Sequence, residues 1–274
     1  MSTASTPNFR FSLIVALLVA HLGPFVTKLL PIPGGGLDMV SMQVVLLACS
    51  VWFIRRRGIT SDDLSGPLPS WRVCVRWLAV AALLPASMGV FCMLVAVLGW
   101  MPASAQVVAR IMSQTDSVPF EMLIVGSVLA PLTEELAFRG LVLRNCLQRM
   151  SVRWAALASA AMFAAIHLGG LMVPQFVGGL FLAVAMLETR SLWLCVLLHA
   201  VNNSGADVLE WLDALASTGD DSRFEQLMTA LPHPVALAML VGVALAWVAL
   251  CVGLVLRLPA APRFRQAWPA LQFA

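Results

Sequence analysis

The sequence predicts an all-α membrane protein, a polytopic bundle of about eight transmembrane helices. Apolar residues make up 60% of the 274 residues and charged residues only 11%, whereas soluble domains carry about 25% charged residues. Stretches of about 20 predominantly apolar residues recur along the chain, and each can cross a hydrocarbon core about 30 Å thick. The arginines also gather near the ends of these stretches, as topology signals do. A soluble globular protein is therefore disfavoured.

The apolar windows give the predicted helices in order: 11–30, 38–54, 77–100, 120–147, 152–172, 174–188, 191–206 and 235–257. The first follows a short polar start and lacks a convincing small-residue cleavage site, so we expect a retained span and not a signal peptide. The segment PIPGGG at 31–36 separates it from the second, because proline and glycine favour turns over helix interiors.

The later boundaries follow from polar segments. The loop SDDLSGPLPS at 61–70 precedes the third helix, and DALASTGDDSRFEQ at 213–226 precedes the last. Residues 102–119 are too polar to span the membrane, and we expect a short interfacial helix there, with a simple loop as the alternative. The sixth and seventh windows are short and contain polar residues. With no internal repeat or second boundary, the prediction is one integral membrane domain over 1–274, with a motif-bearing core at about 120–206.

The basic residues predict the orientation of the bundle. With eight spans and both termini in the cytoplasm, the arginines near the helix ends all fall on the cytoplasmic side, as the positive-inside rule requires: Arg10, Arg55, Arg56, Arg57, Arg72, Arg76, Arg144, Arg149, Arg153, Arg190, Arg257, Arg263 and Arg265. The acidic segment 207–225 falls on the opposite side. An odd number of spans would place arginine-rich loops on both faces.

The net charge and the cysteines exclude other classes of protein. A formal charge of +3 with scattered arginines is not a nucleic-acid footprint, so no nucleic acid is expected as a partner. The six cysteines lie far apart and form no CxxC pair, which indicates neither a zinc knuckle nor a disulfide framework. We interpret them as small core residues.

Ionisable side chains within hydrocarbon are costly, so an intramembrane Glu or His is a functional-site hypothesis. The fourth window contains EELAFRG, in which Glu135 and Arg139 are four residues apart and can pair on one helix face. Glu134 is rotated by about 100° and points elsewhere. An ion network that fixes helix register is the alternative interpretation. Pro131, just upstream, lacks a backbone donor and is expected to kink the helix and make room for water beside Glu134.

Two further windows contain histidine. FAAIH ends at His167 on a small-residue helix, where hydrogen-bonded packing is the alternative to function. In HAVNN, His199 and Asn203 lie one turn apart on one face and converge on one place. His21 and His233 lack polar partners at helical spacing, and we interpret both as structural.

Glu134, His167, His199 and Asn203 come from three predicted helices at compatible depths. A hydrolase needs a base that deprotonates water and later protonates the leaving amine, and a Glu with a His can do this. A second His and an Asn can donate hydrogen bonds to the oxyanion that forms on the attacked carbonyl. Nucleophilic catalysis by Cys195, one turn before His199, is less attractive because no orienting acid lies on that helix.

The segments EELAFRG, FAAIH and HAVNN resemble the ordered motifs EExxxR, FxxxH and HxxxN of the CAAX protease and bacteriocin-processing family, which includes the type II CAAX prenyl endopeptidases. The resemblance covers about 120–206, without departure at the motif residues. It implies an eight-helix intramembrane endopeptidase with a glutamate-dependent mechanism. Glu134 and His167 would activate water and His199 and Asn203 would form the oxyanion hole, while Glu135, Arg139 and Phe163 would support the site structurally.

The resemblance also bears on cofactors. Glu134, His167 and His199 could supply three zinc ligands with an open fourth position. HExxH is absent, and the resemblance favours glutamate and histidine acting without a metal. We therefore expect no cofactor, with zinc as the alternative.

The expected substrate is a membrane-attached protein or peptide, cleaved near its C-terminus by a protein embedded in the bilayer of a bacterial inner membrane. Prenylated CAAX proteins are the substrates of one branch of the family, and a hydrophobic sorting segment or a bacteriocin precursor is equally plausible. The alternative is a non-catalytic immunity or scaffold protein of the same family. A proton-relaying transporter is disfavoured because the sequence has neither repeated halves nor paired broken helices.

Overall fold

The computed structural model describes residues 36–57, 59–99, 124–167, 172–216 and 230–258. These residues form helices and connecting turns, and no strand occurs among them. In chain order the elements are α2 (Gly36–Arg57), α3 (Ser61–Ser65), α4 (Trp71–Val97), η1 (Val125–Leu129), α7 (Ala130–Glu135), η2 (Leu136–Val142), α8 (Leu143–Arg149), α9 (Val152–Ala165), α10 (Met172–Thr189), α11 (Leu192–Ala216) and α13 (His233–Arg257). The all-α prediction is confirmed for this part of the chain.

Seven of the eight predicted windows coincide with helices, and the first lies outside the described residues, as does the proposed interfacial helix at 102–119. Three helices are long and apolar enough to cross a membrane: Trp71–Cys92, Met172–Thr189 and His233–Arg257. The protein is therefore an integral membrane protein, and the count of eight spans stays a prediction.

Four boundaries differ from the prediction. The fifth helix, predicted at 152–172, ends at Ala165 as α9, because the backbone N–H of His167 donates to Ala164, only three residues back, and closes a turn. The seventh helix does not end at residue 206, because α11 continues to Ala216 through the first half of the predicted acidic loop. Charged residues are excluded from hydrocarbon but not from a helix, so the polar composition marked the end of the apolar window and not the end of the helix. The predicted loop 61–70 contains the short helix α3, and α4 begins at Trp71, six residues before the predicted start.

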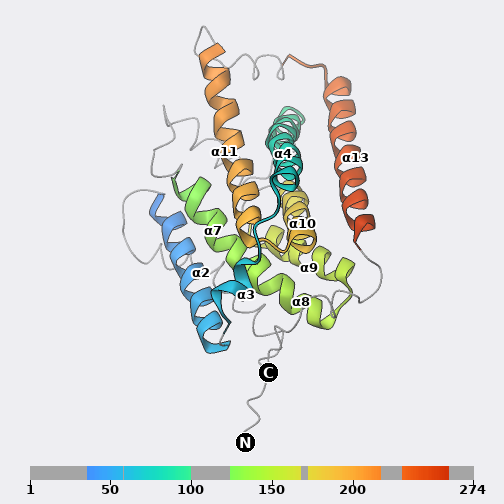
Figure 1. Ribbon diagram of the computed structural model, residues 1–274. Coiled ribbons are helices and arrows are strands. Elements are labelled where there is room, and N and C mark those ends of the chain that lie inside the picture. Colours follow the sequence, from blue (N-terminus) through green and yellow to red (C-terminus); the bar gives the residue numbers. More distant parts are fainter. Residues whose placement is uncertain (1–35, 58, 100–123, 168–171, 217–229, 259–274) are drawn as a thin grey trace, which may run out of the picture.

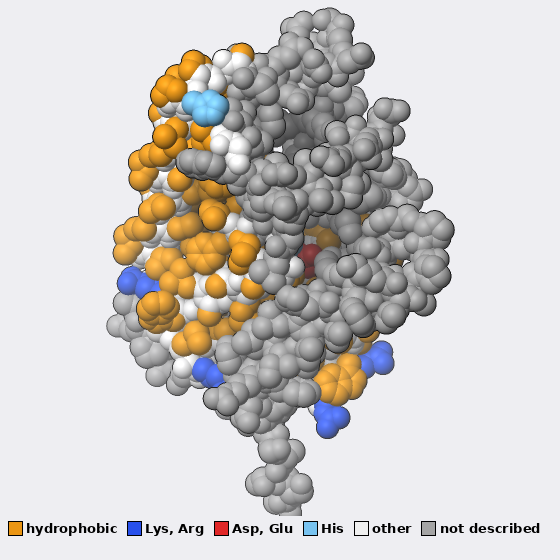
Figure 2. Space-filling model, turned by 180° about the vertical axis from the view of Figure 1, so that it is seen from behind, with side chains coloured by type: hydrophobic (Ala, Val, Ile, Leu, Met, Phe, Trp, Pro, Cys, Tyr) orange, Lys and Arg blue, Asp and Glu red, His pale blue; other side chains and the backbone are white. Residues whose placement is uncertain are grey.

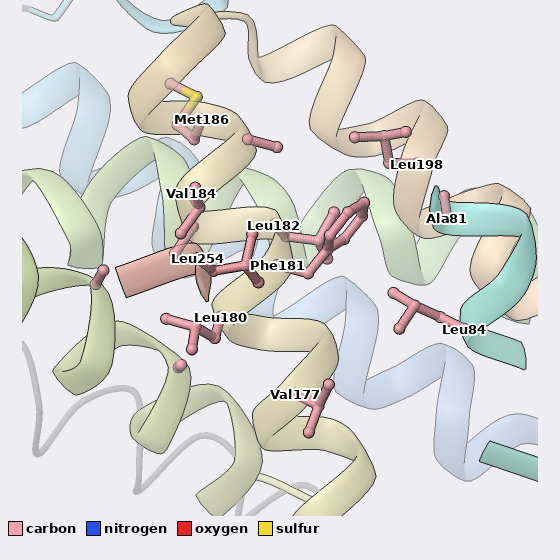
Figure 3. Packing of buried hydrophobic residues seen from close by; sticks show 14 of the residues in the cluster. Ala81, Leu84, Val177, Leu180, Phe181, Leu182, Val184, Met186, Leu198 and Leu254 are labelled. Atoms are coloured by element: carbon pink, nitrogen blue, oxygen red, sulfur yellow. The ribbon is translucent and has the colours of Figure 1, made fainter. Parts of the chain in front are cut away.

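Helix α10 forms the centre of the bundle. It packs against α9, α11 and α13, and α4 in turn packs against α11 and α13 (Figure 1). Residues Val177 to Leu187 of α10 are all buried, so this helix is apolar on every side, as a central helix must be. Figure 3 shows Leu180 and Phe181 of α10 in this core, to which Leu198 of α11 also belongs.

Helix α2 lies at the edge of the described bundle and packs against α7 and the π-helical segments η1 and η2 (Figure 1). Its contact with η2 is apolar, because Leu46 joins Ala137, Phe138 and Phe163 in a small buried cluster. This contact fixes α2 beside the helix that carries the EExxxR motif.

The outer surface of the described helices is apolar. Exposed leucine, valine, methionine and tryptophan side chains cover α4 and α13, and Figure 2 shows them as a broad hydrophobic face with basic side chains toward its lower end. Such a face suits lipid and not water. None of the six cysteines is in a disulfide: Cys146 and Cys195 are buried, and Cys49, Cys74, Cys92 and Cys251 are half-buried.

Candidate active site

The helix that carries EExxxR is not a regular α-helix. Its six-residue α-helical part, α7, lies between η1 and η2. The amide of Ala130 donates to the carbonyl of Val125, and that of Leu143 donates to Phe138, both five residues back. Short π-helical segments within α-helices are frequent at functional sites because the extra residue redirects the side chains around it. Glu134 and Glu135 thus lie between two changes of helical pitch.

Pro131 explains why one carbonyl of η1 is free. In the π pattern the residue that would donate to Gly126 is residue 131, and proline has no backbone N–H. Asn203 of α11 fills this gap, since its Nδ2 donates to the Gly126 carbonyl oxygen at 2.8 Å. Next to Pro131 the structure thus has a π-helical turn that is bridged by a side chain from another helix. A kink that makes room for water beside Glu134 stays a prediction.

The carboxylate of Glu134 is buried and its two oxygens have different surroundings. Oε1 accepts a hydrogen bond from Nε2 of Gln43 at 3.0 Å. Oε2 lies 3.9 Å from Nε2 of His167 and 3.9 Å from Nε2 of His199. The side chain is only 4% exposed, so this carboxylate is held in a largely dry position that faces two imidazoles.

His167 lies in the turn just after α9, and its backbone N–H donates to the carbonyl of Ala164. Its Nδ1 is 2.8 Å from the carbonyl oxygen of Phe163. Because a carbonyl can only accept, Nδ1 carries the hydrogen, and Nε2 of the neutral ring is left as an acceptor facing Glu134. His167 is 26% exposed, more than the other groups around Glu134, and forms the open side of the site.

His199 is bound through its other nitrogen. Its Nδ1 lies 2.8 Å from Oε1 of Glu135, and the same oxygen accepts from Nη1 of Arg139 at 2.9 Å. The ion pair predicted from the i, i+4 spacing is thus present in the structure, and it also holds His199. Both Glu135 and Arg139 are fully buried.

Arg139 extends this network to α10. Its Nη2 donates to the carbonyl oxygen of Gly179 at 2.9 Å, and its guanidinium lies 4.8 Å from the ring centre of Phe163. A Cβ at Gly179 would lie 3.1 Å from Phe163 Cδ1 and 3.3 Å from Ala160 Cα. Glycine at this position therefore allows α9 and α10 to approach closely beside the arginine.

Phe163 is in contact with both histidines. Its ring centre is 4.8 Å from that of His167 and 5.7 Å from that of His199, and Phe138 packs edge-on against it at 5.2 Å. These contacts place an apolar wall beside the polar groups, which strengthens electrostatic interactions by excluding water.

The structure therefore brings Glu134, His167 and His199 to one place, with Glu135, Arg139 and Phe163 packed around them. Asn203 lies one turn beyond His199 and its described hydrogen bond is to Gly126. His233 begins α13 at an exposed position, away from this cluster, and His21 lies outside the described residues.

Two polar residues of the site were missed by sequence reasoning. Gln43 of α2 is 1% exposed, and its Oε1 accepts from the hydroxyl of Thr133. A search restricted to ionisable residues passes over an amide, yet a glutamine within the apolar window 38–54 is also a polar group that must be satisfied. The free-energy cost of placing this amide in hydrocarbon was the signal in the sequence that indicated Gln43.

The separations around Glu134 are too wide for direct zinc ligation. Zinc binds His nitrogen and carboxylate oxygen at about 2.0–2.2 Å, so two tetrahedral ligands lie about 3.3 Å apart. The separations of 3.9 Å between Glu134 Oε2 and the two Nε2 atoms are wider than this. Among the described residues, no group of three or more His, Cys, Asp and Glu has metal-binding geometry. A water molecule with hydrogen bonds of about 2.8 Å fits between the same atoms without movement.

The comparisons with known proteins agree with the motifs. Residues 116–205 match the family model described as Type II CAAX prenyl endopeptidase Rce1-like. The match nearly coincides with the predicted motif-bearing core at 120–206 and includes all three motifs. It supports the resemblance of this region to the CAAX protease family that the motifs indicate. Neither the curated proteins nor the solved structures gave a match.

Proposed function

We propose that the protein is a glutamic-type intramembrane endopeptidase that hydrolyses a peptide bond near the C-terminus of a membrane-attached protein or peptide. The family match supports protease activity. The apolar outer surface supports a substrate that is itself held at the bilayer. One observation carries the mechanism: Oε2 of Glu134 lies 3.9 Å from the Nε2 atoms of both His167 and His199.

In the proposed reaction a water molecule is bound between Glu134 and His167. Its oxygen attacks the scissile carbonyl carbon while its proton passes to Glu134 Oε2, which leaves a tetrahedral intermediate with a negative oxygen. The C–N bond then breaks as the proton moves to the leaving amine. Nε2 of His167 is available as an acceptor because Nδ1 is bound to the Phe163 carbonyl, so it can orient the water.

His199 and Asn203 would stabilise the oxyanion. Because Nδ1 of His199 faces the Glu135 carboxylate and donates to it, Nε2 can donate to an oxyanion when the ring carries both hydrogens. Asn203 uses one of its two amide hydrogens on Gly126. The second is the one that can be donated to substrate.

The substitution Glu134→Gln tests the enzyme. It keeps the size of the side chain and removes the base, so cleavage should fall to the background level. C-terminal peptides from cells that carry wild-type or variant protein, at matched membrane abundance, would be compared by mass spectrometry. Peptides present only with wild type identify the substrate and the cleaved bond. Glu188→Gln, an exposed change at the end of α10, is the matched control and should leave the peptides unchanged.

Unchanged processing and phenotype with Glu134→Gln would refute the enzyme and support a non-catalytic immunity or scaffold protein of the same family. In that case the polar cluster only holds the helices together.

We further propose that catalysis needs no metal, since a bound water suits the separations around Glu134 better than zinc does. Activity of the purified protein on a peptide identified as above should survive exhaustive chelation. Loss of activity with a chelator and recovery with zinc would contradict this.

We also propose that the protein lies in a bacterial inner membrane with eight spans and both termini in the cytoplasm. The distribution of arginines supports this orientation.

A further inference from the structure

Helix α2 contributes one buried amide to the site. Gln43 is 1% exposed, and its two polar atoms have separate partners on α7: Nε2 donates to Oε1 of Glu134, and Oε1 accepts from the hydroxyl of Thr133. Neighbouring residues of one helix are thus bridged by a single side chain from another. A polar side chain this deeply buried is retained at a cost unless both of its ends are satisfied.

The amide can be bound in only one orientation. A carboxylate accepts and cannot donate, so the end of Gln43 that faces ionised Glu134 must be the NH₂ group. The hydroxyl of Thr133 fits this orientation, because it can donate to the amide oxygen. If the amide were reversed, two oxygens would face each other at Glu134.

The consequence concerns the other carboxylate oxygen. With Oε1 held by Gln43 at 3.0 Å, rotation about the terminal bond of Glu134 would break a charge-assisted hydrogen bond in a dry site. Such bonds are about twice as strong as neutral ones. Oε2 is therefore kept directed at His167 and His199.

We propose that Gln43 is a positioning residue: its buried amide holds Oε1 of Glu134 and thereby directs Oε2 toward the histidines. This extends the proposed function, on which its catalytic meaning rests. The hydrogen-bond contact itself can be tested without a substrate.

The test is infrared spectroscopy of the full-length protein in lipid nanodiscs. The carboxyl stretching bands of Glu134 are identified by their absence from Glu134→Gln. In Gln43→Met, which keeps the length of the side chain and removes the donor, these bands should shift in frequency because the hydrogen bond to Oε1 is lost. The other groups that face Glu134 are His167 from the turn after α9 and His199 from α11, with Glu135 and Arg139 on its own helix, and all are unchanged.

The matched control is Leu46→Val. Leu46 lies one turn after Gln43 and packs α2 against Phe138. This substitution therefore loosens the packing of the same helix and leaves the amide in place, so the infrared bands of Glu134 should be those of wild type. The hydroxyl of Thr133 keeps acceptors in Gln43→Met, because the carbonyls of Leu129 and Ala130 lie 3.0 and 3.1 Å away. The variant therefore leaves no orphaned donor on α7.

Thr133→Val supplies a second variant. It keeps the amide and removes the hydroxyl that donates to its oxygen, so a smaller shift in the same direction is expected, with no further shift when it is added to Gln43→Met. The inference is overturned if Gln43→Met has the same bands as wild type, or if Leu46→Val shifts the bands equally.

Processing in cells then separates this inference from the proposed function. Peptides that depend on Glu134 should fall about tenfold in Gln43→Met and stay near wild type in Leu46→Val. If Glu134→Gln does not change processing, the endopeptidase proposal fails while the infrared result still decides the role of Gln43. If Glu134→Gln abolishes processing and Gln43→Met does not lower it, the positioning role fails alone.

Discussion

One carboxylate oxygen of Glu135 accepts two hydrogen bonds within the site. Its Oε1 accepts from Arg139 and from His199, and the side chain is fully buried. Its other oxygen, Oε2, has no hydrogen-bond partner in the described part of the chain. One atom thus links the ion pair to an imidazole on another helix, so this carboxylate supports the fold and orients His199 together.

Glu135→Gln should therefore affect both stability and activity. Removing the negative charge weakens the pairing with Arg139 and the hydrogen bond that orients His199. We expect the free energy of unfolding to fall by about 1–3 kcal/mol and the cleavage rate to fall on the order of 100-fold, as when one oxyanion donor is lost. Thermal unfolding in detergent and peptide cleavage measure the two effects. Glu134→Gln, which leaves the ion pair intact, should lose cleavage and keep stability; a stable, fully active Glu135→Gln would contradict this role.

At the residue scale, local geometry was predictable and distant contacts were not. The pair of Glu135 and Arg139 follows from i, i+4 spacing, which the sequence contains directly. The contact of His199 with Glu135 joins residues 64 positions apart, and no spacing rule gives it. Gln43 joins Glu134 across 91 positions, and nothing in the sequence pairs the two.

At the element scale, the helix from Val125 to Arg149 depends on another helix to complete its hydrogen bonds. Pro131 leaves the Gly126 carbonyl without a backbone donor, and Asn203 of α11 supplies one. The sequence predicted a disturbance at Pro131 but not its form. Whether a helix kinks or takes a π-helical turn depends on what the neighbouring elements can donate.

The two substitutions Asn203→Leu and Pro131→Ala should therefore be coupled. In the wild type, Asn203→Leu leaves a carbonyl unpaired and should cost about 1–2 kcal/mol. With Pro131→Ala, a backbone N–H at position 131 can take over, so the cost should be smaller by about 1 kcal/mol. Chemical unfolding of the four proteins measures this coupling. Ser204→Ala removes a hydroxyl that bonds within α11 to Ala200 and should cost the same in both backgrounds; an equal cost for Asn203→Leu would refute the bridge.

At the scale of the whole molecule, apolar windows were a good guide to helices and a weaker guide to their ends. They report where hydrocarbon is tolerated, which is why the windows from 38 to 257 recovered the helices while α11 continued beyond its window to Ala216. The same limit applies to topology, because arginines indicate sides only as a bias.

The proposed topology can be measured by cysteine labelling in sealed vesicles, with the six native cysteines replaced. Arg56→Cys near the end of α2 and Glu188→Cys near the end of α10 should react with an impermeant reagent from one side. Ala230→Cys, exposed just before α13, should react from the other. Labelling of all three from one side would require a different number of spans.

The cluster around Glu134 also has a simple electrical property. Glu135 and Arg139 carry opposite charges and are both fully buried. In the proposed reaction the proton of the water passes to Glu134 and then to the leaving amine. The cluster therefore ends the reaction with the same number of protons as at its start. An enzyme built in this way can complete its turnover without transferring net charge into the bilayer, where such a transfer would be most costly.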